Sequence, residues 1–243
     1  QARTNVASPQ VEGSAKSEST YNWQTASGSI RTIAHFVDVS KQALADVPWL
    51  RPTVDGELVY GLKVKEEAEI LSGDGTGVHL NGIITQATAF DTNYLKATPG
   101  WTRLDILRYA KLQARLAGLA TYAPSAFVLH PTDLAELELT KDDEKRYVIG
   151  DPVGRPVGII TVPFVWNLPV VESDSISAGT FLVGAFNSAA ALIDRQAVSV
   201  EISYEHGDNF TLNMATILCE ERIGLGVKKA DAFITGSFTT SPE

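Results

Sequence analysis

The run Gly73-Asp74-Gly75-Thr76-Gly77 is the segment of this 243-residue chain whose composition most suggests chemistry. Closely spaced glycines let backbone N–H groups approach an anion, so the run could bind the phosphate of a small ligand. A phosphate-binding P-loop also contains a lysine and opens a helix, whereas this run has no lysine and follows a helical pattern. We therefore expect the glycines to end a helix in a tight turn. An enzyme that acts on a phosphorylated ligand is a distant alternative.

Residues that could bind a metal or catalyse a reaction are scattered along the chain. The four histidines lack metal-binding spacing; they are His35, His79, His130 and His206. No serine lies in a nucleophile elbow, and there is no HExxH pattern. The acidic cluster Asp142, Asp143 and Glu144 could hold a divalent cation weakly, but a solvated loop is the simpler interpretation. We expect no active site for a diffusible substrate, no cofactor and no metal.

The composition is that of a globular protein, with 44% hydrophobic and 20% charged residues. No apolar run approaches the roughly 20 residues of a membrane span, so we expect no membrane segment. A single cysteine, Cys219, fits a reducing cytoplasm. The net charge of −9 repels a phosphate backbone at long range, which disfavours tight nucleic-acid binding unless basic residues cluster locally. The sequence shows no long basic run.

The first 29 residues are polar and rich in Ser, Thr, Gly and Glu, so they cannot bury themselves. We expect them to form an arm and a protruding loop. A strand follows from Ile30 to Val39, with apolar residues interleaved among polar ones: Ile30, Ala34, Phe36 and Val39. The segments 10–23 and 30–37 could be the two sides of a long hairpin. Because a lone hairpin is marginally stable in water, we expect it to rest on another surface.

The pattern predicts a helix over about residues 48–71, with Asp46 as N-cap, Pro48 in the first turn and Gly73 as its stop. One side is apolar, with Leu50, Val54, Leu58, Leu62, Ala68 and Leu71. The opposite side is charged, with Arg51, Asp55, Lys63, Glu66 and Glu67. A second helix starts at Thr102, has Asp105 in a capping-box position and runs to about Gly118.

The remaining chain reads as short strands and one further helix. The strand 126–129 precedes a helix that opens near Thr132 or Asp133, and 141–146 reads as an exposed loop. Further strands are predicted at 169–171, 180–186, 189–193, 198–202, 211–218 and 232–238. The whole is a mixed α+β arrangement.

Several segments, in this order, resemble the major capsid proteins of tailed bacteriophages, the HK-ninety-seven-like shell fold. They are 12–19 (EGSAKSES), 32–36 (TIAHF), 73–77 (GDGTG), 146–152 (RYVIGDP), 166–171 (WNLPVV), 208–210 (DNF) and 213–222 (NMATILCEER). The sequence departs from that pattern at Ser17, where a proline is usual, and at Lys41, where an arginine is common.

The resemblance implies an architecture and a partner. An N-terminal arm and extended loop would occupy residues 1–40, a peripheral domain with a long spine helix 41–100, and an axial domain 101–195, before residues 196–243 return to peripheral strands. Copies would close as pentamers and hexamers into an icosahedral shell, assembled in the bacterial cytoplasm. The shell would become the virion capsid, enclosing double-stranded DNA without binding it specifically. Portal, scaffold or maturation protease, and decoration proteins would be further partners.

Some members of that family join subunits through an isopeptide bond between a loop lysine and an asparagine, assisted by a glutamate. The matching positions are Lys16, Asn213 and Glu220. Such chemistry needs burial, to lower the pKa of the lysine and raise that of the glutamate. Gln10 and Gln196 stand where an apolar lining is implied, which weakens this expectation. The odd separation of Asn213 and Glu220 along one strand would put them on opposite faces, so the acid would come from another chain.

Ordinary intersubunit contacts are the simpler expectation for the charged residues of the loop and spine helix. The candidates are Glu12, Lys16, Glu18, Arg31, Lys63, Glu66 and Glu67. An encapsulin, a bacterial compartment of the same fold that encloses a cargo enzyme, is the nearer alternative. The chain begins at Gln1 and its only methionine is Met214, so we expect the initiator end to be missing. The resemblance implies an N-terminal scaffolding segment that a protease removes.

Overall fold

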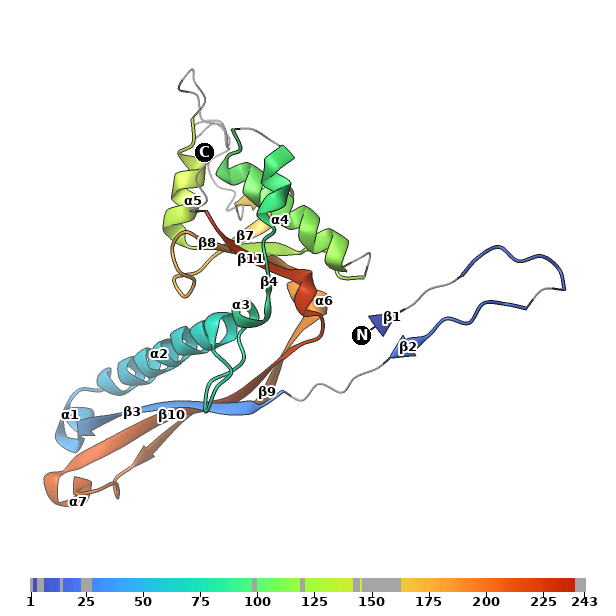
Figure 1. The fold of residues 1–243 in the computed structure, drawn as a ribbon. Coiled ribbons are helices and arrows are strands. Elements are labelled where there is room, and N and C mark those ends of the chain that lie inside the picture. Colours follow the sequence, from blue (N-terminus) through green and yellow to red (C-terminus); the bar gives the residue numbers. More distant parts are fainter. Residues whose placement is uncertain are drawn as a thin grey trace.

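The computed structural model describes residues 2–3, 7–13, 15–22, 28–97, 100–118, 121–141, 145 and 163–238. Two sheets organise the body: one lies along a long helix, the other lies beyond one end of that helix, and a loop from the N-terminal region projects away from both (Figure 1). The acidic cluster at 142–144 and most of the predicted loop at 141–146 lie outside the described residues. Within the described part, no helix is long and apolar enough to cross a membrane.

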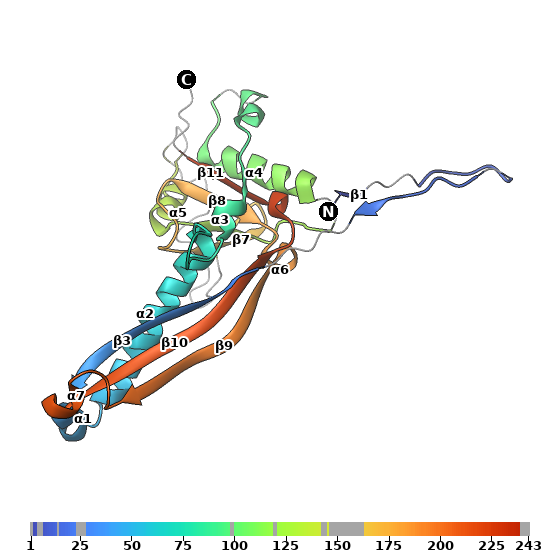
Figure 2. The same cartoon turned by 60° about the horizontal axis from the view of Figure 1, so that its bottom comes forward.

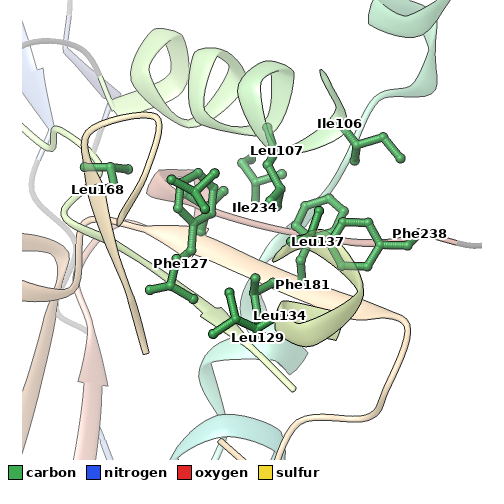
Figure 3. Close-up of a cluster of buried hydrophobic side chains, with 14 of the residues drawn as sticks. Ile106, Leu107, Phe127, Leu129, Leu134, Leu137, Leu168, Phe181, Ile234 and Phe238 are labelled. Carbon is green, nitrogen blue, oxygen red and sulfur yellow. The ribbon is translucent and has the colours of Figure 1, made fainter. Parts of the chain in front are cut away.

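A six-stranded mixed sheet forms the first region, in the order β4-β11-β8-β5-β7-β6. Its strands are β4 (Thr88–Ala89), β5 (Ala126–Leu129), β6 (Phe164–Val165), β7 (Leu168–Glu172), β8 (Thr180–Gly184) and β11 (Phe233–Ser237). Two helices pack on it, α4 (Arg103–Gly118) and α5 (Pro131–Glu138). Figure 3 shows their leucines meeting Phe127, Phe181 and Phe238 in one apolar cluster. Phe127 and Phe181 are fully buried, so this region has a core of its own.

A three-stranded antiparallel sheet forms the second region, in the order β3-β10-β9 (Figure 2). The strands are β3 (Ile30–Ser40), β9 (Ala190–Ser203) and β10 (Met214–Val227). The long helix α2 (Leu50–Ser72) covers one face, where Leu58 and Leu62 pack against Ile217 and Cys219. Strand β10 continues past this cluster to place Leu225 in a second cluster, which adjoins the six-stranded sheet. A register shift between Glu220 and Ile223 interrupts its pairing with β9.

The start of α2 differs from the prediction. Asp46 ends a separate short helix, α1 (Lys41–Asp46), and Pro48 lies in the turn between the two helices. Trp49 is the N-cap and has no side-chain capping hydrogen bond. The sequence pattern predicts one capped helix because a three-residue break leaves no pattern of its own.

The end of α2 is where the sequence placed it, at Gly73, but the reason is packing. Gly73 has φ −53°, so no left-handed conformation is required there. A Cβ would instead lie 2.2 Å from the Leu80 carbonyl oxygen. The Gly82 N–H donates to the Gly73 carbonyl at 2.9 Å, which closes the turn. These contacts confirm the interpretation of the glycine run as a helix stop.

The capping box of α4 is confirmed. The Thr102 N–H donates to the Asp105 carboxylate at 2.8 Å, and the Asp105 N–H reaches Thr102 Oγ1 at 3.4 Å. Helix α5 begins slightly earlier than predicted, because His130 is its N-cap and accepts from the Thr132 N–H at 3.2 Å. Pro131 then occupies the first turn, where its missing N–H costs nothing.

The proposed hairpin between 10–23 and 30–37 is wrong. Strand β2 (Tyr21–Asn22) pairs with β1 (Ala2–Arg3), whereas β3 pairs with β10 in the body. The strand at 30–39 is confirmed, but the covered face carries Ile33 and Val37, and Phe36 is 56% exposed. Both faces of β3 carry apolar residues, so alternation alone could not identify the buried one.

The C-terminal strands are longer than predicted, and their boundaries differ. The segments 189–193 and 198–202 belong to one strand, β9, and the strand predicted at 211–218 starts at Met214 after a short helix, α7 (Asn209–Leu212). Another short helix, α6 (Phe186–Ala189), ends the strand predicted to reach 186. Strand β11 lies in the six-stranded sheet, between β4 and β8.

Candidate assembly surfaces

The extended loop carries three of the predicted contact residues, and it exposes all of them. Glu12, Lys16 and Glu18 are exposed, and so is nearly every other described residue from 7 to 20. Both views show this segment projecting away from the body (Figures 1 and 2). Val11 is 77% exposed although it is apolar. Such a segment gains little free energy from its own subunit.

The charged residues of α2 do not all face solvent. Glu66 is 8% exposed, whereas Lys63 and Glu67 are exposed. The Lys63 ammonium pairs with Glu66, three residues on, and with Glu221 of β10 at 3.0 Å. The hydrogen bond that Lys63 donates to Glu66 is the main reason why the pKa of Lys63 lies above its ordinary value. Lys63 therefore bridges α2 to the sheet within one subunit.

Glu221 is the most deeply buried charged residue here, at 1% exposure. Its Oε2 accepts from Lys63, but its Oε1 is buried without a hydrogen-bond partner. Burial raises the pKa of Glu221, and the nearby Glu66 carboxylate acts in the same direction against the pull of Lys63. Two carboxylates thus share one cation between helix and sheet, an arrangement that favours a proton on Glu221.

Glu69 follows Glu66 by about one turn of α2 and is also buried, but unlike Glu221 it has a hydrogen-bond partner at both carboxylate oxygens. Its Oε1 lies 2.8 Å from both Lys65 Nζ and His79 Nδ1, and its Oε2 accepts from the Leu80 N–H at 3.1 Å. Burial alone would raise the pKa of Glu69, but these hydrogen bonds outweigh it and lower the pKa. Glu69 therefore links the glycine turn to the helix. Its carboxylate lies beside the turn, and this negative charge disfavours binding of a phosphate there.

Glu67 and Arg31 are available for contacts in different ways. Ser173 Oγ donates to Glu67 Oε1 at 2.5 Å, which links the exposed edge of α2 to the loop after β7. A groove of about 530 Å³ runs beside this contact, with Ile70, Val128 and Phe186 in its wall. Arg31 is half-buried, and its Nε has no hydrogen-bond partner among the described residues.

The residues matched to crosslinking lie far apart within one subunit. Asn213 is exposed in a left-handed conformation, φ 52°, between α7 and β10. Glu220 lies seven residues along β10, about 23 Å away in an extended strand. Gln196 Nε2 donates to Glu220 Oε1 at 3.0 Å, so a polar group does adjoin this acid. One subunit does not bring Asn213 and Glu220 together.

Other side chains of these surfaces had no signal in the sequence. Asp38 accepts from Thr216 Oγ1, which in turn accepts from Asn209 Nδ2 at 2.6 Å. This chain of hydrogen bonds fixes α7 to the sheet. Asn209 and Thr216 are close in sequence, but Asp38 is distant, and the pairing of β3 with β10 brings it to them.

The fold and these surfaces define a shell-type protein, and comparison with known proteins gives the family. The model of the phage capsid family matches residues 1–238, and the chain belongs to that family. The resemblance seen in the sequence and the mixed α+β shell fold are thereby confirmed.

Among individual relatives, the major capsid protein of Enterobacteria phage HK97 is 41% identical over 237 residues. The match covers 98% of this chain and 59% of that protein, so the chain spans about three fifths of the relative's length. A chain from Gordonia phage Cozz has a TM-score of 0.72 at 14% identity, covering 99% of this chain and 80% of that one. The capsid of an empty GTA particle gives 0.69 at 16% identity, covering 96% and 80%.

Proposed function

We propose that this chain is the major capsid protein of a tailed bacteriophage and that its copies assemble, as pentamers and hexamers, into an icosahedral shell around double-stranded DNA. The observation that carries the proposal is the exposed loop at 7–20, which projects from a subunit whose two sheets each have a buried core. A projecting segment of this kind is stabilised when it lies on a neighbouring copy. Family membership supports the same conclusion.

Deleting residues 10–29 tests this role, because β3 starts at Ile30 and the body keeps its strands. We expect a folded, soluble subunit that forms no shells. Electron microscopy and sedimentation would measure assembly, and circular dichroism would measure folding. Normal particles from the deletion would contradict the proposal.

A matched control separates the length of the loop from its chemistry. Replacing residues 10–20 with a glycine-serine segment of equal length keeps the connection but removes Glu12, Lys16 and Glu18. If side-chain contacts hold the loop on a neighbour, this variant assembles as poorly as the deletion. Full assembly would reduce the loop to a tether.

The predicted contact residues divide into two groups under this proposal. Lys63 is occupied within its own subunit by Glu66 and Glu221, so Lys63 and Glu66 would support a contact surface indirectly. Glu67 is better placed to bind a neighbour, because its side chain is exposed, whereas Arg31 is half-buried and its Nε is not accessible.

Covalent joining of Lys16 to Asn213 is a finer proposal, in which the neutral lysine amine attacks the Asn213 side-chain amide, the new C–N bond replaces the C–NH2 bond, and ammonia leaves. The roughly 23 Å between Asn213 and Glu220 along the strand requires the assisting acid to come from another copy. Denaturing electrophoresis of assembled particles would show a ladder if the bond forms and a single band near 26.2 kDa if it does not. Lys16→Arg keeps the charge, and it would abolish the ladder without changing particle shape.

The encapsulin alternative differs in what the shell encloses. Particles purified with their contents would contain double-stranded DNA under the present proposal and a folded enzyme under the alternative. Scaffold, protease, portal and decoration partners remain expectations, which co-purification from infected cells would test. Assembly in the host cytoplasm would be seen in sections of such cells.

A further inference from the structure

The outer face of α4 is basic although the protein as a whole is acidic. This helix contains Arg103, Arg108, Lys111 and Arg115 but a single acid, Asp105, while the chain has a net charge of −9. Arg103 pairs with Glu136 of α5. The other three follow one another at spacings of three and four residues, which places them along one side of the helix. The sequence shows no basic run because these residues are separated by apolar ones.

Arg108 and Lys111 lack acidic partners. Among the described residues, no carboxylate lies within ion-pair distance of either side chain. Lys111 is half-buried, and its ammonium donates to the Trp166 carbonyl oxygen at 2.5 Å. Burial lowers the pKa of Lys111, and repulsion by Arg108 lowers it further. Two adjacent cations without a counter-charge form a surface that an anion would stabilise.

A strained turn places an aromatic ring beside these cations. Trp166 and Asn167 join β6 to β7 with positive φ values of 51° and 61°. A left-handed conformation is unfavourable for a residue as bulky as tryptophan. The turn is nevertheless held against α4, since Trp166 Nε1 donates to the Leu104 carbonyl at 2.9 Å and Arg108 lies 5.9 Å from the ring. The ring remains 45% exposed, and Phe164 next to it is 58% exposed.

We infer that this surface, formed by Arg108, Lys111, Arg115 and Trp166, contacts the phosphate backbone of duplex DNA. Cations set beside an exposed aromatic ring are the combination that nucleic-acid surfaces use. The net negative charge does not prevent contact, because charges beyond a Debye length of about 8 Å are screened at physiological ionic strength. The source of the DNA, an enclosed genome, rests on the proposed function. The contact itself does not.

The contact is weak because it has few positive charges. Two or three cations neutralise few phosphates, so we expect non-specific affinity and a logarithmic salt slope of roughly −2 to −3. Such binding lets DNA shift along the wall as it is packed. The rest of the acidic subunit would keep the DNA at a distance.

To test the inference, fluorescence anisotropy would measure the binding of a labelled 20-base-pair duplex to unassembled subunits at several salt concentrations. We expect R108Q/K111Q to weaken binding and to reduce the magnitude of the salt slope by about 2. The control R51Q/K228Q removes the same charge from exposed positions on other elements and should keep the slope. Equal losses in both variants, or an unchanged slope in the first, would overturn the inference.

Trp166→Asn tests the ring separately, because asparagine adopts a left-handed conformation readily and keeps the turn. We expect weaker binding with the salt slope unchanged. Circular dichroism checks that each variant is folded. If R108Q/K111Q instead loses self-association while DNA binding persists, the surface is a contact between copies and the inference fails. Electron microscopy of the same variants reports on shell formation, so the proposed function is judged independently.

Discussion

The six-stranded sheet and the extended loop show how differently two parts of one chain obtain stability. The sheet encloses Phe127, Phe181 and Phe233 at full burial, with helices packed on it. The loop at 7–20 is exposed throughout almost all of its described length. The first region is held by contacts within the subunit. The second has little burial within the subunit, and under the proposed function a neighbouring copy would stabilise it.

The helix α2 and its sheet stand between these extremes. They have a small apolar cluster, but three buried glutamates lie beside it: Glu66, Glu69 and Glu221. Burying carboxylates is costly unless they are paired. Stability here therefore depends on electrostatics and pH more than in the six-stranded sheet, whose described region buries one carboxylate, Asp133.

Removing a core ring should give the largest effect. Phe181→Ala would destabilise the subunit by about 3–5 kcal/mol, because it removes a fully buried side chain and leaves a cavity. Denaturant unfolding would measure this. Phe36→Ala is the matched control, since the same side chain is 56% exposed there and its loss should cost far less. A similar loss of unfolding free energy in both variants would contradict the claim that the six-stranded sheet is held by its buried core.

Glu69→Gln should have the next largest effect. An amide cannot replace the charge that binds Lys65 and His79, so we expect a loss of about 1–3 kcal/mol at neutral pH. The pKa of Glu69 is lowered by folding, so its contribution is present above the ordinary value of 4.5 and disappears as pH falls through the lower, folded value. Unfolding midpoints at several pH values would show this. Glu57→Gln, at an exposed site on the same helix, should be nearly neutral.

Glu221→Gln should act in the opposite direction. Folding raises the pKa of Glu221, so its contribution to stability is complete below 4.5 and is lost as pH rises through the folded value. We therefore expect the variant to be at least as stable as the parent at neutral pH, with a flatter pH profile. Glu201→Gln, exposed on β9, is the control. A clear loss at neutral pH would mean that the ion pair with Lys63 outweighs the cost of burial.

Lys16→Ala should change subunit stability least, by no more than about 0.5 kcal/mol, because the side chain is exposed. Its effect should appear only in assembled particles, as weaker resistance to denaturant. Measuring both quantities sharpens the comparison, since a core variant would change them together. A large loss in the isolated subunit would show that the loop folds back on its own body.

Local signals predicted the helices well. The capping box at Thr102 and the stop at Gly73 are each encoded within a few residues. What sequence could not predict is decided by pairing between distant segments. Phe36 and Ile33 are both apolar, and only the position of α2 determines which one is covered.

The same limit applies to the candidate surfaces. Exposure of the loop followed from its polar composition. The burial of Glu66 did not, because Glu66 shares the Lys63 ammonium with Glu221, and Lys63 and Glu221 are 158 residues apart in the chain. The surface on α4 was not predicted for a related reason. The turn that carries Trp166 lies 62 residues from Leu104 in the chain and contacts α4 only in the folded structure.

Strand β10 has a mechanical consequence. It is a single strand of 14 residues that contributes Ile217 to the apolar cluster beneath α2 and Leu225 to the cluster beside the six-stranded sheet. Between these two residues, near Glu220, its pairing with β9 is irregular. In the proposed shell, a force applied by a neighbouring subunit at the far end of β10 would bend the strand at this irregularity. The curvature of such a shell would then depend on how far one strand bends.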